Sequence, residues 1–166
     1  CHGNHLIRKP SDDMLGTGPD AVCVSCHEPG SAGFVAAQQM RASIERVKTG
    51  VTRAEGVVAQ AAALGMDTTD AEFALHEAAA QLTQARTYVH AFSASAIEPI
   101  AEEGVRDARQ AGEQGRLAIH EFHFRRQGLW VTLAILLVLI GGLLVMIREH
   151  EPPRPPGKTP PPGGSP

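Results

Sequence analysis

The chain of 166 residues is predicted to be mainly α-helical. It is expected to comprise an irregular N-terminal segment that contains the cysteines, an antiparallel helical bundle or coiled coil, one C-terminal transmembrane helix and a disordered tail. Three observations predict this class. Apolar residues recur in heptad steps through the middle of the chain, aromatic residues make up only 4% of it, and one long stretch near its C-terminus is uncharged and apolar. The expected regions are residues 1–32, 33–126, 127–148 and 149–166.

The first region, 1–32, is rich in Gly, Pro, Asp and Ser and has little hydrophobic periodicity, so another element must hold it in shape. It contains all 3 cysteines of the chain. That number is odd and too small for the disulfide framework of a secreted scaffold. A covalently bound cofactor is the element we expect.

Residues 23–27 read Cys-Val-Ser-Cys-His, the C-x-x-C-H sequence that attaches c-type haem. Cys23 and Cys26 are expected to form thioethers with the two haem vinyl groups, and His27 to bind the iron as the proximal ligand. Two other interpretations are a zinc site and a redox dithiol. Zinc would normally need a second cysteine pair, and a thioredoxin-type dithiol would need a βαβ context. The sequence shows neither, so the predicted cofactor is haem c.

The chain begins with Cys1-His2, which matches the last two residues of another C-x-x-C-H sequence. We interpret it as a truncated motif in which Cys1 forms a thioether and His2 is a proximal iron ligand. An upstream haem domain would then be missing from this chain. The alternatives for Cys1 are a free terminal thiol and the lipidated cysteine of a lipoprotein.

Three helices with short connections are expected in the second region, and such an arrangement predicts an antiparallel bundle. The first runs from about residue 34 to 64 and the second from about 70 to 92, and the third continues toward the membrane. Each carries an apolar heptad seam, listed in order as Met40, Ile44, Val47, Val51, Ala54, Val58 and Ala61; Leu75, Ala78, Leu82, Ala85, Val89 and Phe92; and Ile97, Ala101, Gly104, Ala108, Ala111, Gly115, Ala118 and Phe122. The small residues of the third seam would let a neighbouring helix approach closely.

Local signals predict the helix ends. Gly65 is expected to end the first helix. Thr69 with Glu72, and Ser95 with Glu98, have the spacing of capping boxes that begin the second and third helices. Pro99 suits the first turn of the third.

The uncharged stretch Leu129–Ile147 predicts a transmembrane helix. At 1.5 Å per residue it spans about 28 Å, close to the roughly 30 Å of the bilayer core. Arginines flank it on both sides, and Trp130 lies where an interfacial aromatic residue is expected. The tail that follows holds most of the chain's 12 prolines. It is expected to be extended and solvated, with a P-x-x-P ligand as the alternative.

Several stretches together resemble a known family. CHGNH at residues 1–5, then IRKPSDDMLGTG and CVSCH, are similar to the last haem sites of membrane-anchored multihaem c-type cytochromes of the class III-like kind. ARTYVHAF (85–92) and FRRQGL (124–129) resemble the tail of that family. The resemblance covers almost the whole chain except the proline-rich end. The chain departs from the family in lacking the first cysteine and both spacers of the first motif.

The resemblance implies that each haem iron has a second axial ligand, usually histidine. His5 and His90 are the candidate distal ligands. Lower-ranked candidates are His76, Met14, Met40 and Met66. His120 and His123, just before the predicted membrane helix, are candidates for a quinol-facing surface, and no role is assigned to His150.

The predicted function is electron transfer by a membrane-tethered periplasmic multihaem cytochrome c. The chain would cross the bacterial inner membrane once, with its haem region in the periplasm and its tail in the cytoplasm. Expected partners are the membrane, redox proteins or the quinol pool, whereas a net charge of −3 gives no reason to expect nucleic acid. Two alternatives are the C-terminal part of a multihaem reductase of small nitrogen or sulfur oxyanions, and a haem-free, membrane-anchored helical interaction protein.

Overall fold

The computed structural model of the chain describes residues 9–150. They form three α-helices, α1 (Ala32–Ala63), α2 (Thr69–Tyr88) and α3 (Ala94–His150), and three short 3-10 turns, η1 (Asp12–Met14), η2 (Cys23–Ser25) and η3 (Val89–Ala91). No strand occurs in this part of the chain, and the prediction of a mainly α-helical protein is confirmed. The fold divides into two units between His123 and Phe124. The predictions for Cys1, His2, His5 and the tail after His150 lie outside the described residues.

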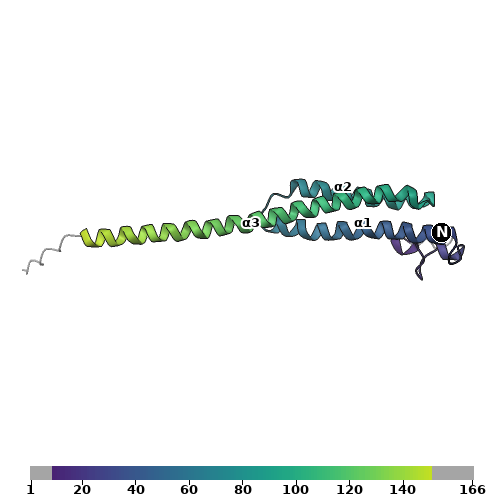
Figure 1. The fold of residues 1–166 in the computed structure, drawn as a ribbon, viewed down its shortest axis with the longest axis horizontal. Helices are drawn as coiled ribbons and strands as arrows, with labels where there is room; N and C mark the ends of the chain where they lie inside the picture. The colour runs from purple at the N-terminus through teal and green to yellow at the C-terminus, as the bar shows by residue number, and fades with distance from the viewer. Residues whose placement is uncertain (1–8, 151–166) are drawn as a thin grey trace, which may run out of the picture. The chain divides into compact units, whose positions relative to one another are not determined.

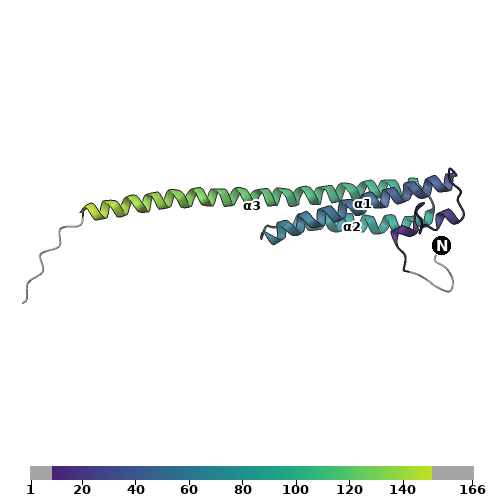
Figure 2. The ribbon, with the colours of Figure 1, turned by 90° about the horizontal axis from the view of Figure 1, so that it is seen from below.

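The first unit is a bundle in which α1 and α2 lie alongside the N-terminal part of α3 (Figures 1 and 2). Val47 of α1 faces Gly104 of α3, and further along Val57 faces Gly115, so these two helices run in the same direction. The short turns that join α2 to both neighbours make it run the opposite way. Each helix is thus antiparallel to the one that follows it in the chain, as the short connections predicted.

The apolar seam of α1 forms the centre of the bundle. All seven predicted seam residues are buried, with at most 6% of any of them exposed. The helix begins where the Ser31 side chain accepts a hydrogen bond from the Phe34 amide at 3.3 Å. It ends before Gly65, whose φ of +74° is the left-handed conformation that favours glycine. Both the buried stripe and the helix stop agree with the prediction.

The predicted seam of the second helix fails at its C-terminal end. Ala78, Leu82 and Ala85 are buried, but the side chain of Phe92 is 71% exposed. The reason is local: α2 ends at Tyr88, the tighter turn η3 follows, and Phe92 itself has a left-handed φ of 52°. A 3-10 turn has about three residues per turn instead of 3.6, and a left-handed residue then reverses the chain. Residues after Tyr88 therefore no longer fall on the buried face that the heptad spacing predicts.

Neither predicted capping box forms. Asp67 caps α2, because its carboxylate accepts a hydrogen bond from the Thr69 amide at 3.0 Å, while Glu72 accepts from the Thr68 hydroxyl at 2.6 Å. At the start of α3, Glu98 turns away from its own helix toward α1 and accepts from Ser43 at 2.7 Å and from an arginine at 2.6 Å. These tertiary bonds lower the pKa of Glu98, the Ser43 bond contributing most. They replace the local caps because they join a carboxylate to donors on a neighbouring helix.

Small residues let α3 pack tightly against the other two helices. A β-carbon placed on Gly104 would lie 2.9 Å from Cγ1 of Val47 and 3.0 Å from Cβ of Gln81. Gly50 and Gly115 are similarly close to the neighbouring helix. The predicted role of the small residues in the third seam is therefore confirmed. Ala118 and Phe122, at its end, are only half-buried.

The second unit contains the C-terminal part of α3. This helix is long and apolar enough to cross a membrane, and none of its most apolar stretch is buried against protein. Side chains such as Leu129, Trp130 and Val138 are between 61% and 75% exposed. The predicted membrane segment 127–148 lies entirely within α3, which continues to His150.

Candidate functional site

The C-x-x-C-H sequence forms one tight turn. Cys23 begins η2, and its carbonyl accepts hydrogen bonds from the amides of Cys26 at 3.3 Å and His27 at 3.1 Å. Cys26 follows the 3-10 turn with a φ of −127°, so the two cysteines stand at the two ends of the turn with the C-x-x-C spacing that two bonds to one haem require.

The three motif residues differ in burial. Cys23 is half-buried and packs against the main apolar core, whereas Cys26 and His27 are exposed. The His27 imidazole lies directly against the α-carbon of Gly33 in the first turn of α1, where any β-carbon would collide with the ring. A glycine at position 33 thus allows His27 to rest on the helix.

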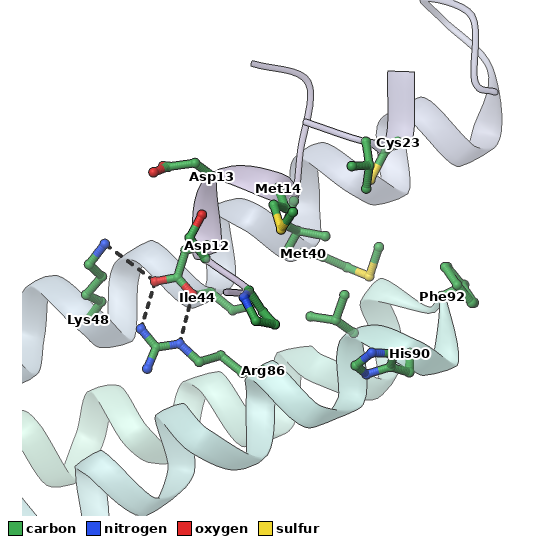
Figure 3. Close-up of a pocket in the computed structure, with 15 residues that line it drawn as sticks. Asp12, Asp13, Met14, Cys23, Met40, Ile44, Lys48, Arg86, His90 and Phe92 are labelled. Atoms are coloured by element: carbon green, nitrogen blue, oxygen red, sulfur yellow. Dashed lines mark hydrogen bonds and ion pairs between the residues drawn. The ribbon is translucent and has the colours of Figure 1, made fainter. Parts of the chain in front are cut away.

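A cavity of about 530 Å³ opens beside Cys23, between the N-terminal segment, α1 and the end of α2 (Figure 3). Its volume lies within the range of small-molecule and cofactor sites, roughly 300–1,000 Å³. Most of the wall is apolar, including Leu15, Val22, Ile44, Val89 and Phe92. The exposed Phe92, displaced from the core by the end of α2, is one of the residues that border this cavity.

The cavity brings together several of the predicted ligands. His90, Met14 and Met40 all line it with Cys23, although they come from four different segments of the chain. His90 Nδ1 lies 3.0 Å from the carbonyl oxygen of Thr87. The side chain of His90 is exposed on its outer side, whereas Met40 is buried in the core.

Other predicted residues lie elsewhere. Cys26 and His27 are not part of the cavity wall, and neither are Met66 and His76. His120 and His123 are exposed on α3, where the ring of His123 makes an edge contact with Phe122 at 5.6 Å between centroids. Within residues 9–150, no group of three or more His, Cys, Asp and Glu side chains is arranged to hold a metal ion.

An ion cluster of Asp12, Lys48 and Arg86 forms one edge of the cavity (Figure 3). The Arg86 guanidinium donates two hydrogen bonds to the Asp12 carboxylate, at 2.8 and 2.7 Å, and Lys48 Nζ lies 3.5 Å from it. Only 11% of the Asp12 side chain is exposed. The cluster ties the segment that carries the C-x-x-C-H sequence to both α1 and α2. Sequence reasoning missed it because Asp12 and Arg86 are 74 positions apart and belong to no local motif.

The hydrogen bonds from Arg86 hold the pKa of Asp12 below its usual value, and burial only partly opposes them. Replacing Asp12 with asparagine is expected to lower the free energy of unfolding by about 1–2 kcal/mol near neutral pH, since Arg86 loses the carboxylate that accepts both of its hydrogen bonds, whereas Lys48 keeps its ion pair with Glu45. A depressed carboxyl pKa stabilises the fold above the unfolded value of about 3.9 and stops doing so as the pH falls through the folded value. The difference between wild type and Asp12→Asn should therefore disappear in acid.

Urea unfolding of the full chain in detergent, followed by circular dichroism at several pH values, measures this effect. Asp13→Asn is the matched control, because the neighbouring Asp13 side chain is 68% exposed and its ion pair with Arg41 should contribute less than about 1 kcal/mol. Equal losses in both variants, or a loss that does not change with pH, would show that the ion cluster does not hold this segment.

The site thus consists of an apolar cavity lined by the first thiol of the C-x-x-C-H sequence, an imidazole and two methionine thioethers, with two cations at its edge and the second thiol outside it. No protein-family model, no curated protein and no solved structure matches this chain.

Proposed function

We propose that this chain belongs to a membrane-tethered multihaem c-type cytochrome, which passes single electrons between a membrane donor and an acceptor. The observation that carries the proposal is that Cys23, in a complete C-x-x-C-H sequence, borders an apolar cavity lined also by His90, Met14 and Met40. Covalent haem needs two suitably spaced thiols, an axial ligand and an enclosure that keeps water from the ring. These residues have that chemistry.

The residues fit haem c in three respects. Cys23 and Cys26 lie at the two ends of one tight turn with the spacing of haem thioethers, and Cys23 is the motif residue that lines the cavity. The cavity beside Cys23 has the volume and the apolar walls of a cofactor site. The cavity edge carries two cations, Arg86, which pairs with Asp12, and Lys48, which lies 3.5 Å from Asp12 and 3.3 Å from Glu45 outside the wall. Carboxylate groups such as the haem propionates pair well with such cations.

The roles of the residues follow from this fit. When bound, haem supplies an iron that gains and loses one electron. Cys23 and Cys26 hold the group covalently, and His27 supplies the proximal nitrogen. In the tautomer with its proton on Nδ1, His90 donates to the Thr87 carbonyl, and Nε2 then carries the lone pair that iron needs. The apolar walls limit the access of water. They therefore raise the free energy of the ferric state, which carries one more positive charge than the ferrous state.

We further propose that α3 crosses the inner membrane once. Its C-terminal stretch has the required length and hydropathy, and its large apolar side chains are exposed. Haem is attached to c-type cytochromes outside the cytoplasm, so the cavity would face the periplasm and the C-terminal tail the cytoplasm. The electron donor would then be the quinol pool or a membrane protein, and the acceptor a periplasmic redox protein.

The test is to purify the mature protein from its native membranes. The tryptic peptide that contains both Cys23 and Cys26 should be heavier by one haem, the visible spectrum should be that of low-spin iron, and redox titration should show reversible one-electron steps. A peptide without added mass would reject the haem and favour a haem-free interaction protein. A high-spin site that binds small anions would identify a reductase instead of an electron carrier.

A further inference from the structure

Away from the cavity, the groove between α1 and α3 is strongly basic. It is about 750 Å³ in volume and has a floor of small residues. Arg46 and Arg53 line it from α1, and Arg109 and Arg116 from α3; the one acidic side chain in its wall, Glu45, pairs with Arg41 and Lys48. We call it the basic groove.

Three of the four guanidinium groups form no ion pair within the described residues. Arg46 pairs with Glu98 at 2.6 Å, but Arg53, Arg109 and Arg116 form no ion pair with any residue in the range 9–150. The positively charged arginines that line this groove repel one another, so an acidic partner would be attracted to it. The floor of Gly50, Ala54, Ala108 and Gly112 has short side chains that allow another helix to approach closely.

The opposite flank of α3 carries the complementary charge. Glu77 of α2, with Glu103 and Asp107 of α3, forms what we call the acidic ridge. Glu103 and Asp107 are four residues apart on one face of α3, and the contact of Gln81 with Gly104 brings Glu77 to the same flank. Burial and the charges of Glu103 and Glu77 raise the pKa of Asp107, and Arg106 opposes them only in part. The ion pair from Glu103 to Arg106 is exposed and 3.7 Å long, so it neutralises little of this charge.

The two charged surfaces lie at the same level of the bundle. Val47 faces Gly104 and Gly50 faces Ala108, so the stretch of α1 between Arg46 and Arg53 lies level with residues 103–111 of α3. On the other side Gln81 of α2 also meets Gly104, which sets Glu77 about one helical turn farther along, level with Asp107. A copy of the bundle placed beside the first in parallel therefore brings acidic ridge and basic groove together without a shift along the axis.

We propose that the basic groove of one copy of this chain binds the acidic ridge of a second copy, so that copies associate side by side and in parallel. The one candidate membrane helix within residues 9–150 lies C-terminal to the bundle, so that copies inserted in the same bilayer share one orientation, and parallel association requires this. Because the two surfaces differ, the contact is heterologous and leads to a closed ring or a row of copies. The proposal does not depend on the haem.

The test uses two charge-reversal variants of the full chain in detergent, studied by analytical ultracentrifugation. The groove variant is Arg53→Glu with Arg109→Glu, and the ridge variant is Glu103→Lys with Asp107→Lys. Each alone should associate at least about tenfold more weakly than wild type, because like charges then face each other. An equimolar mixture of the two should associate again, since the intact ridge of the first fits the intact groove of the second and the two reversed surfaces also carry opposite charges.

Two controls test whether the effect is specific to these surfaces. The variant Glu55→Lys with Ala59→Lys changes exposed α1 residues outside both surfaces and should leave association unchanged. Circular dichroism checks that every variant folds. Wild-type association should weaken as salt is raised from low to physiological concentration, because exposed charges are screened. A monomeric wild type, a mixture that stays monomeric, or variants that associate as wild type does would each overturn the proposal.

Discussion

In the haem-loaded chain, replacing His90 with alanine is expected to convert the iron at the Cys23–His27 site from low-spin to high-spin. His90 lines the cavity beside Cys23, and the Thr87 carbonyl at 3.0 Å from its Nδ1 orients the ring. Loss of the imidazole would leave iron with one protein ligand, and a five-coordinate iron has a weaker ligand field. Visible absorption and electron paramagnetic resonance of the full protein should show the change for one haem, whatever the number of haems present.

His76→Ala is the matched control, because His76 is exposed on the same helix that leads to His90 but does not line the cavity. Its spectrum should be unchanged. Met40→Leu provides the decisive comparison, since Met40 lines the cavity and leucine has a similar volume but no sulfur. A spectrum that is insensitive to the loss of His90 but altered in Met40→Leu would assign the thioether as the distal ligand and reject His90.

Replacing Gly104 with leucine is expected to lower the free energy of unfolding by about 3 kcal/mol, the upper end of what overpacking a core normally costs. A first β-carbon alone would lie 2.9 Å from Val47 and 3.0 Å from Gln81, on two different helices. A leucine side chain at position 104 can therefore be accommodated only if α3 moves away from both α1 and α2. Urea unfolding in detergent, followed by far-ultraviolet circular dichroism, measures the loss.

Gly56→Leu is the control with the same chemical change. Gly56 is exposed on α1, and no atom lies within 4 Å of the position that its β-carbon would take. Leucine is a better helix former than glycine, so this variant should be more stable by about 0.5–1 kcal/mol. If the free energy of unfolding falls in Gly104→Leu and rises in Gly56→Leu, close packing at Gly104 is the cause of the loss. A Gly104→Leu variant as stable as wild type would mean that the three helices do not pack as closely as described.

The helical part of the fold was predictable because its information is local. The α1 seam could be identified residue by residue, since a heptad repeat of apolar side chains leaves only one stripe to bury. The same rule failed at Phe92, because a heptad count cannot detect the point at which a helix tightens into a 3-10 turn and reverses. Glu98 shows a second kind of failure. Its spacing from Ser95 suited a local cap, but donors on α1 offered a better set of hydrogen bonds.

The amino-acid order alone determined the helical class, the buried stripe of α1, the apolar stretch of α3 and the C-x-x-C-H turn, because each depends on residues a few positions apart. Tertiary structure decided which side chains meet Cys23, how Asp12 is tied to Arg86, and how basic and acidic flanks align along α3. These features join residues that are tens of positions apart. Only the packing of three helices around one core brings such residues within reach of one another.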